Sequence, residues 1–189
     1  MNFGQLKMYI DGELVSSVNN VTKEIYSPLN DERIATLSWA NSLDSERALK
    51  SAEQGFNTWS KTPVNKRKEW MLLLRDKMLE KEEILRKSIS YEMGKPYGAT
   101  AEDIESITNS LKYYSDIVED YQKDKEIIDP DGTHNHHLVS KPIGVVVAYL
   151  AWNFPLLNAG FKLGPALASG CSIILKPSEL SPVSLYIIG

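Results

Sequence analysis

Two polar side chains that could bind a ligand follow two apolar segments near the end of the sequence. Asn153 comes shortly after the first segment, and Lys176 comes directly after the second. Ligands bind at the carboxyl ends of the strands in open parallel sheets, so both side chains are candidates for a binding site. Each also has an ordinary interpretation from the residues alone. Asn153 could only cap a helix, and Lys176 could be a solvated lysine in a loop.

Residues 144–179 predict the element that would position these side chains. Residues 145–150 form an apolar, β-branched run without alternation, which is typical of a parallel strand buried on both faces. Pro155 suits the first turn of a helix, with Asn153 at or near its N-cap, and Gly170 would end that helix. Residues 173–175 give the second strand. The pattern predicts a right-handed βαβ crossover, the unit of a doubly wound nucleotide-binding sheet.

The residues before this unit predict a mainly helical front half. One helix starts near Asp44, a long second helix starts at Thr62 and Pro63, and a third follows Thr100 and Asp103, which have capping-box spacing. In the second helix, apolar positions are expected to be buried and charged positions solvated. The apolar positions are Trp70, Leu74, Met78, Leu85 and Ile89, and the charged ones include Lys66, Arg67, Glu80 and Lys81.

Two hairpins and a short strand complete the predicted elements. Residues 8–15 read as a small hairpin around an Asp-Gly turn, and residues 33–37 as a strand. Residues 121–141 are polar and read as a hairpin of two strands, 126–128 and 136–139, around a Pro-Asp-Gly turn. The three histidines, His134, His136 and His137, lie on this hairpin. No cysteine or carboxylate spacing completes a metal site with them, so we expect solvated histidines and no bound metal.

Composition narrows the class of protein. With a net charge of −4 and a pI of about 5.5, the chain has no electrostatic footprint for nucleic acid or for an anionic membrane. The single cysteine, Cys171, excludes an internal disulfide and fits a reducing compartment. The start of the chain lacks a signal pattern, and no apolar run is long enough to span a bilayer. We therefore expect a cytoplasmic, water-soluble protein.

The sequence also predicts that the sheet is incomplete. Residues 144–179 supply about one βαβ unit, and residues 181–188 begin a further apolar helix pattern at the end of the chain. A doubly wound sheet needs several such units. We therefore expect residues 1–189 to be the N-terminal part of a cofactor-binding region from a longer protein, with its catalytic domain absent.

Several short motifs together resemble the N-terminal portion of the NAD(P)-dependent aldehyde dehydrogenase superfamily. The resemblance extends over essentially all 189 residues, and it depends on the order of the motifs more than on any single one. The motifs are YIDGE at 9–13, SPLN at 27–30, EMGKP at 92–96, KPIGVV at 141–146, WNFP at 152–155, KLGPAL at 162–167 and KPSE at 176–179.

The resemblance implies a role for Asn153. In that family the asparagine of the WNFP motif donates its side-chain amide to the aldehyde oxygen, which becomes negative when a thiolate attacks the carbonyl carbon. A fixed, neutral donor suits such an oxyanion. The resemblance also implies that residues 121–141 form an oligomerisation arm, so the full-length protein would be a homodimer or a homotetramer.

The resemblance implies a cofactor as well. In the family, the lysine equivalent to Lys176 holds the adenosine ribose hydroxyls, with Ser178 and Glu179 beside that ribose. An acid at position 179 can accept from the 2′-hydroxyl and repel a 2′-phosphate, which favours NAD and leaves NADP possible. The expected cofactor-binding residues are Leu150, Ala151, Trp152, Lys176, Pro177, Ser178 and Glu179. The first three would line the path of the cofactor mainly with backbone atoms.

The sequence departs from the family pattern in several ways. Ala151 stands where proline is usual, so the position of Asn153 is expected to be less fixed. The family's cysteine nucleophile, its glutamate base and its glycine-rich phosphate turn have no counterpart in residues 1–189. Cys171 lies between a glycine and an apolar strand, where a buried structural cysteine is expected.

Two functions therefore stay open at this point. The first is the N-terminal portion of an oxidoreductase that converts an aldehyde to a carboxylic acid through a cysteine thiohemiacetal, with residues 1–189 inactive alone. The second is a truncated, non-catalytic NAD-binding or assembly module.

Overall fold

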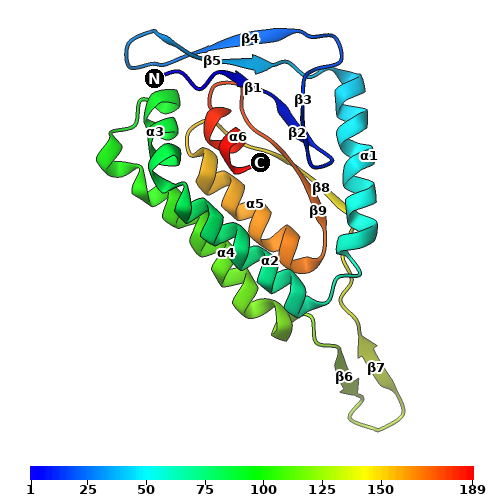
Figure 1. The fold of residues 1–189 in the computed structure, drawn as a ribbon. Helices are drawn as coiled ribbons and strands as arrows, with labels where there is room; N and C mark the ends of the chain where they lie inside the picture. Colours follow the sequence, from blue (N-terminus) through cyan, green and yellow to red (C-terminus); the bar gives the residue numbers. More distant parts are fainter.

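The computed structural model describes residues 1–189, in which helices pack beside four small sheets (Figure 1). The helices are α1 (Ser42–Trp59), α2 (Val64–Glu80), α3 (Glu82–Met93), the short 3-10 helix η1 (Tyr97–Ala99), α4 (Ala101–Tyr121), α5 (Pro155–Ser169) and α6 (Val183–Ile188). No helix is both long and apolar enough to cross a membrane.

The strands pair in four groups. Strand β5 (Arg33–Ser38) lies between β1 (Gln5–Leu6), to which it is parallel, and β4 (Thr22–Tyr26), to which it is antiparallel. The two predicted hairpins are present as β2 (Met8–Ile10) with β3 (Glu13–Val15), and as β6 (Lys125–Ile128) with β7 (Asn135–Leu138). The remaining pair is β8 (Val145–Tyr149) with β9 (Ser172–Lys176), and these two strands are parallel.

The βαβ unit is present as predicted, because α5 connects β8 to the parallel strand β9. Pro155 is the first residue of α5, and Gly170 ends it with a φ of 87°, a left-handed conformation that favours glycine. The unit places the carboxyl ends of both strands at one edge of the sheet.

The prediction that the first strand is buried on both faces is wrong. Along β8, Ala148 is 4% exposed while its neighbour Tyr149 is 77% exposed, and Val147 is also exposed. Ala148 packs into the main apolar core with residues of α4 and α5, whereas the alternating residues face the other side of the two-stranded sheet. Within residues 1–189 nothing covers that other side enough to bury Tyr149.

Helix α5 lies beside α4 (Figure 1), and two glycines of α5 leave no room for a side chain where the helices meet. A Cβ atom added to Gly160 would lie 2.9 Å from the Cα of Ile107, and one added to Gly164 would lie 2.5 Å from Oγ of Ser110. The Ser110 hydroxyl donates a hydrogen bond of 2.6 Å to the Gly160 carbonyl. The absence of side chains at the two glycines therefore sets the distance between the helices.

The predicted long second helix is two helices. Helix α2 ends at Glu80, Lys81 leaves helical geometry with φ −102° and ψ 11°, and α3 begins at Glu82. Trp70 is 59% exposed rather than buried. Arg67 is only 4% exposed rather than solvated, because its guanidinium donates to the Ala168 carbonyl at the end of α5. The last carbonyls of a helix need such donors.

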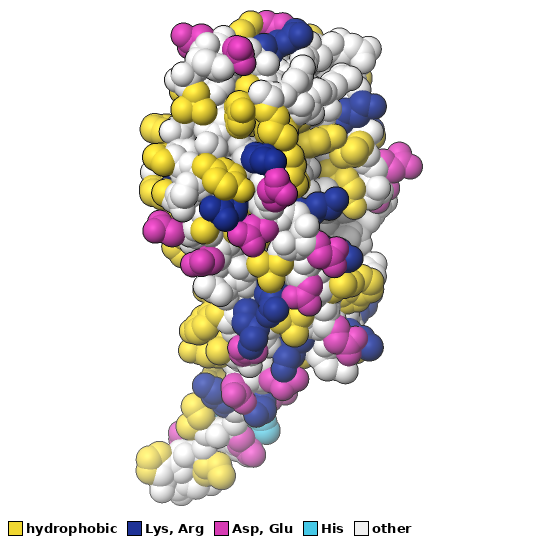
Figure 2. Space-filling model, turned by 60° about the vertical axis from the view of Figure 1, so that its left-hand side comes forward, with side chains coloured by type: hydrophobic (Ala, Val, Ile, Leu, Met, Phe, Trp, Pro, Cys, Tyr) yellow, Lys and Arg dark blue, Asp and Glu magenta, His cyan; other side chains and the backbone are white.

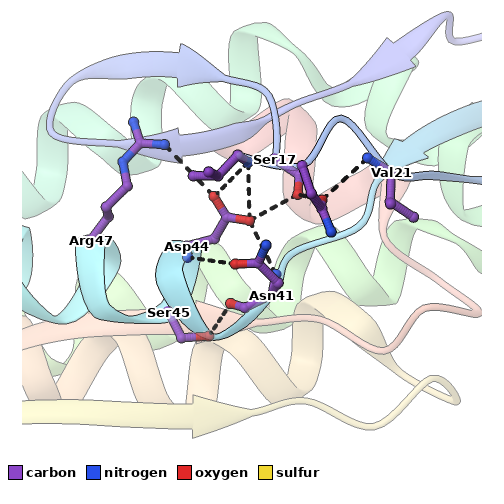
Figure 3. A network of polar contacts seen from close by, with 8 residues as sticks. Ser17, Val21, Asn41, Asp44, Ser45 and Arg47 are labelled. Carbon is purple, nitrogen blue, oxygen red and sulfur yellow. Dashed lines mark hydrogen bonds and ion pairs between the residues drawn. The ribbon is translucent and has the colours of Figure 1, made fainter.

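The start of the first helix also differs from the prediction. Its N-cap is Asn41, and Asp44 is the third helical residue of a capping box. Asp44 is buried, and its carboxylate accepts hydrogen bonds from the Ser17 hydroxyl and the Val18 N–H in the preceding segment (Figure 3). The network therefore attaches α1 to the chain that precedes it.

Two other predicted caps are only partly correct. Pro63, not Thr62, is the N-cap of α2. Thr100 is the N-cap of α4, but its side chain makes no capping hydrogen bond. Asp103 forms no capping box there; it pairs instead with Lys95.

The outer surface of the helices carries interspersed charges of both signs, as Figure 2 shows for one face. Many of them pair along a helix, as Lys66 does with Glu69 and Lys112 with Asp116. Exposed pairs of this kind contribute little to stability. The hairpin of β6 and β7 extends away from the body (Figure 1), and all residues of both strands are exposed.

The histidines lie on this hairpin. His134 and His136 lie 3.5 and 3.2 Å from Asp129, and in residues 1–189 no group of three ligating side chains is arranged to hold a metal ion.

The helix crossing gives the first prediction. Gly160→Ala should lower the free energy of unfolding by about 1–3 kcal/mol, because the new methyl group meets the backbone of Ile107. Gly55→Ala in α1 is the matched control. Its added Cβ has no atom within 4 Å, so it should raise stability by up to about 1 kcal/mol. Urea denaturation of both variants measures the difference, and equal effects would contradict the prediction.

Candidate functional site

The candidate site lies at the carboxyl ends of β8 and β9. Lys176 is the last residue of β9, and Asn153 lies in the loop that follows β8. A hydrogen bond of 3.0 Å from the Leu150 N–H to the Lys176 carbonyl extends the strand pairing by one residue. The two loops that carry the predicted site residues therefore leave one edge of the sheet side by side.

Asn153 is exposed and makes no side-chain hydrogen bond in the structure. The N-cap of α5 is Phe154, and no side chain caps the helix there. The interpretation of Asn153 as a helix cap is therefore wrong. Its amide is free to donate to a ligand at the start of α5, where the helix dipole also favours negative charge.

Lys176 and Glu179 lie close together in the second loop. Their Nζ and Oε2 atoms are 3.8 Å apart, and both side chains are about half exposed. A hydrogen bond from its own backbone N–H, and then the ammonium groups of Lys176 and Lys23, hold the pKa of the Glu179 carboxyl below its usual range. At neutral pH, Glu179 is therefore an ionised acceptor beside a cationic donor, and the ion pair is loose enough for both to reach a ligand.

The other predicted cofactor residues surround this edge. Ala151 and Trp152 are exposed in the first loop, while Leu150 is buried and presents only backbone to the site. Pro177 and Ser178 are half-buried, and the Ser178 Oγ accepts from the Leu180 N–H at 3.2 Å. These residues border the sheet edge at which Asn153, Lys176 and Glu179 are exposed. The apolar hollow of about 420 Å³ lies elsewhere, at the base of the hairpin, where α4 meets α5.

Sequence reasoning missed Glu92, near the end of α3. Its carboxylate accepts hydrogen bonds from the N–H groups of Val183 (2.6 Å) and Ser184 (3.2 Å) at the start of α6, and the residue is 4% exposed. Burial raises its pKa to about 7 despite these hydrogen bonds. The helical spacing from Leu85 and Ile89 was the available signal, because it places Glu92 on the buried face.

Sequence reasoning also missed Lys95. Its ammonium pairs with Asp103 at 2.5 Å, and it lies 5.0 Å from the centroid of the Phe154 ring. Both charged side chains are largely or fully buried. Its position after the glycine that ends α3 indicated only a helix stop, and the EMGKP motif at 92–96 marked the family without giving Lys95 a role.

The buried Glu92 gives a prediction for stability against pH. The folded-state pKa is raised, so between pH 4.5 and 7 the folded protein holds a proton that the unfolded chain releases. Stability from this group therefore falls as pH rises through that window, by up to about 3 kcal/mol. Glu92→Gln should remove this part of the pH dependence. Urea denaturation at pH 5 and pH 7.5 compares the variant with the wild type.

Glu83→Gln is the control for that experiment. Glu83 is on the same helix but exposed, and its pKa is lowered by Lys87. The Glu83→Gln variant should lose as much stability between pH 5 and pH 7.5 as the wild type does. An equal pH dependence of stability in the wild type and in Glu92→Gln would contradict the assignment of this pH dependence to Glu92.

Comparison with known proteins decides the family. The model of the aldehyde dehydrogenase family matches residues 15–189. The chain belongs to the aldehyde dehydrogenase family. This confirms the resemblance carried by the sequence motifs.

Relatives of the family cover nearly the whole chain. Aminoaldehyde dehydrogenase 2 of Solanum lycopersicum is 32% identical over 187 residues, which are 97% of this chain and 37% of the relative. The 3,6-anhydro-alpha-L-galactose dehydrogenase of Vibrio sp. (strain EJY3) is 30% identical over 184 residues, which are 97% of this chain and 38% of that relative. The chain thus spans a little over a third of the length of these curated relatives.

Solved structures of the family confirm the fold class. Betaine aldehyde dehydrogenase from Staphylococcus aureus, solved with NAD⁺, matches with a TM-score of 0.90 and 34% identity over 97% of this chain and 36% of that one. A 3,6-anhydro-L-galactose dehydrogenase solved with NADP matches with a TM-score of 0.91 and 30% identity over 97% of this chain and 38% of that one. The chain has the fold of the N-terminal part of the family's Rossmann-like domain.

The relatives do not share one compartment. Matching betaine and aminoaldehyde dehydrogenases from Amaranthus hypochondriacus and Malus domestica are named as chloroplastic and peroxisomal. The cytoplasmic location of this protein stays a prediction.

Proposed function

We propose that the complete protein oxidises an aldehyde to a carboxylic acid with NAD, and that residues 1–189 supply two parts of its site. Asn153 is the donor to the substrate oxygen, and Lys176 with Glu179 holds the adenosine ribose. The observation that carries the proposal is the Leu150 to Lys176 hydrogen bond, which sets both loops at one sheet edge. The family match and the NAD⁺-bound relative support it.

Asn153 acts on the substrate. Attack of a thiolate on the aldehyde carbon pushes the carbonyl electrons onto oxygen, and the oxyanion needs a donor that is already in place. The amide of Asn153 is neutral, exposed and not engaged with another residue. A donor of this kind stabilises the transition state more than the substrate, and losing one typically costs about 10²–10³ in rate.

Lys176 and Glu179 act on the cofactor. The ammonium donates to the ribose hydroxyls, and the ionised carboxylate accepts from the 2′-hydroxyl, as the lowered pKa of Glu179 allows. The same carboxylate repels a 2′-phosphate, so NAD is preferred over NADP. A cofactor held by these residues would supply the hydride acceptor for the oxidation. Ala151 and Trp152 border the cofactor, with Pro177 and Ser178 beside the ribose.

Cys171 takes no part in this chemistry. The residue is 2% exposed, and its Sγ accepts a hydrogen bond from the Ser169 hydroxyl at 3.4 Å. The proposal therefore places the attacking thiolate and the general base in other parts of the complete protein. We expect the 189 residues alone to produce no NADH from aldehydes.

The test of Asn153 uses the complete protein, with aldehyde-dependent NADH formation as the readout. Asn153→Ala should lower kcat by about 10²–10³ and leave NAD affinity near the wild-type value. Asn57→Ala, an exposed change of the same kind in α1, should leave both unchanged. A wild-type protein that binds NAD stoichiometrically without turnover would overturn the proposal in favour of a non-catalytic NAD-binding or assembly module.

We also propose that the protein self-associates through the hairpin of β6 and β7. The hairpin is an arm that extends from the body, and on it Ile127 is 50% exposed and Ile128 is 64% exposed. Unpaired strand edges favour pairing with another chain. A homodimer or homotetramer is the expected assembly.

Light scattering after size-exclusion chromatography tests the arm. Ile128→Asp in the complete protein should reduce the molar mass to that of a smaller assembly, because it buries a carboxylate in an apolar contact. Leu43→Asp is the matched control, since Leu43 is also exposed, by 52%, and lies in the first turn of α1, where an acid is favourable. An unchanged mass for Ile128→Asp would exclude the hairpin as the contact.

A further inference from the structure

The turn that ends α3, residues 92–95, contacts residues next to each of the two site loops and has no part in the function proposed so far. Glu92 lies at one end of this turn and holds the start of α6. Lys95 lies at the other end and contacts the ring next to Asn153. We name residues 92–95 the α3 turn.

Glu92 fixes the downstream end of the ribose loop. This loop runs from Lys176 at the end of β9 to Val183 at the start of α6. Strand pairing holds its upstream end. At its downstream end, the Glu92 carboxylate accepts from the N–H groups of Val183 and Ser184, and the side chains of both are fully buried. The carboxylate is therefore the polar contact from α3 that holds the end of the loop, beside the apolar cluster in which Val183 and Tyr91 pack.

Lys95 fixes the loop that carries Asn153. Its ammonium lies 5.0 Å from the centroid of the Phe154 ring, a distance at which a cation is attracted to the ring face. Phe154 follows Asn153 directly and is the N-cap of α5. The ammonium itself donates to Oδ2 of the fully buried Asp103 carboxylate, whose Oδ1 atom has no hydrogen-bond partner.

The α3 turn is itself held firmly in place. Gly94 has a φ of 73°, and a Cβ at this position would lie 3.3 Å from Pro28. The Ser27 hydroxyl donates to the Tyr91 carbonyl at 2.7 Å, and the Ser90 hydroxyl donates to the Lys95 carbonyl at 2.8 Å. A turn held by these contacts can position the two loops that it reaches.

We propose that Glu92 and Lys95 are positioning residues, Glu92 for the ribose loop and Lys95 for the oxyanion donor Asn153. The inference rests on the proposed function and adds to it the element that holds both loops in register. The inference requires that the loss of NAD affinity and the loss of kcat be separable, because each residue reaches only one loop.

The test measures NAD affinity and kcat separately in the complete protein. Glu92→Ala should raise the Kd for NAD about tenfold and leave kcat at saturating NAD close to wild type. Glu92→Gln should have a Kd for NAD between that of the wild type and that of Glu92→Ala, because its one amide oxygen can still accept from Val183. Lys95→Met should lower kcat by about tenfold to a hundredfold and leave the Kd for NAD unchanged.

Two further variants keep the Lys95 arm testable if Lys95→Met does not fold, since that change leaves Asp103 unpaired. Lys95→Arg keeps the cation and should restore kcat. Phe154→Leu keeps the ion pair and removes the ring face, and it should lower kcat as Lys95→Met does. Lys87→Met and Glu83→Gln, an exposed pair on the same helix, are the controls and should change neither quantity.

The outcomes separate the two proposals. If folded Glu92 variants bind NAD as the wild type does, or if folded Phe154→Leu keeps the wild-type kcat, the positioning inference fails while the proposed function stands. Equal losses of affinity and kcat in all variants would indicate general destabilisation and would also overturn the inference. A wild-type protein that neither binds NAD nor oxidises aldehydes would overturn the proposed function, and this inference with it.

Discussion

Helix α5 can lie where it does only because Gly160 and Gly164 leave no side chain between it and α4. The position of α5 matters because this helix connects β8 to β9 and packs against both strands. Its other end is held by Arg67, whose guanidinium donates to the Ala168 carbonyl. A helix displaced by one methyl group at the crossing would move its N-terminus, and with it the loop that carries Asn153.

Local features of the fold could be predicted from the sequence, and features that depend on distant neighbours could not. Pro155 and Gly170 bounded α5 correctly, because a helix start and a left-handed end depend on the residue itself. Arg67 and Tyr149 were misjudged, because their burial depends on what packs against them. In the site, the predicted ends of the two strands were enough to place Asn153 and Lys176 at one sheet edge. Glu92, however, contacts Val183, which is 91 residues away in the sequence. No local pattern could pair those two residues.

Two buried carboxylates show how the balance between burial, hydrogen bonds and nearby cations decides the state of an acid. Burial alone would raise the pKa of Asp44, but hydrogen bonds from Asn41, Ser17 and Val18 outweigh it and lower the pKa. Glu92 also accepts hydrogen bonds, from Val183 and Ser184, but burial outweighs them, so its pKa rises to about 7. Asp44 therefore fastens a helix at all physiological pH values, whereas the contact made by Glu92 changes its charge near neutrality.

The crossing of α4 and α5 also has a consequence for synthesis on the ribosome. Ile104, Ile107 and Leu111 of α4 are buried in the core that α5 completes, yet α5 is about 50 residues further along the chain. At about 5–20 residues per second, the ribosome needs about 3–10 s to make that stretch. During this time the apolar face of α4 lacks its partner helix. A nascent chain of this protein therefore exposes the part of that apolar face that α5 later covers, although α2 already packs against α4.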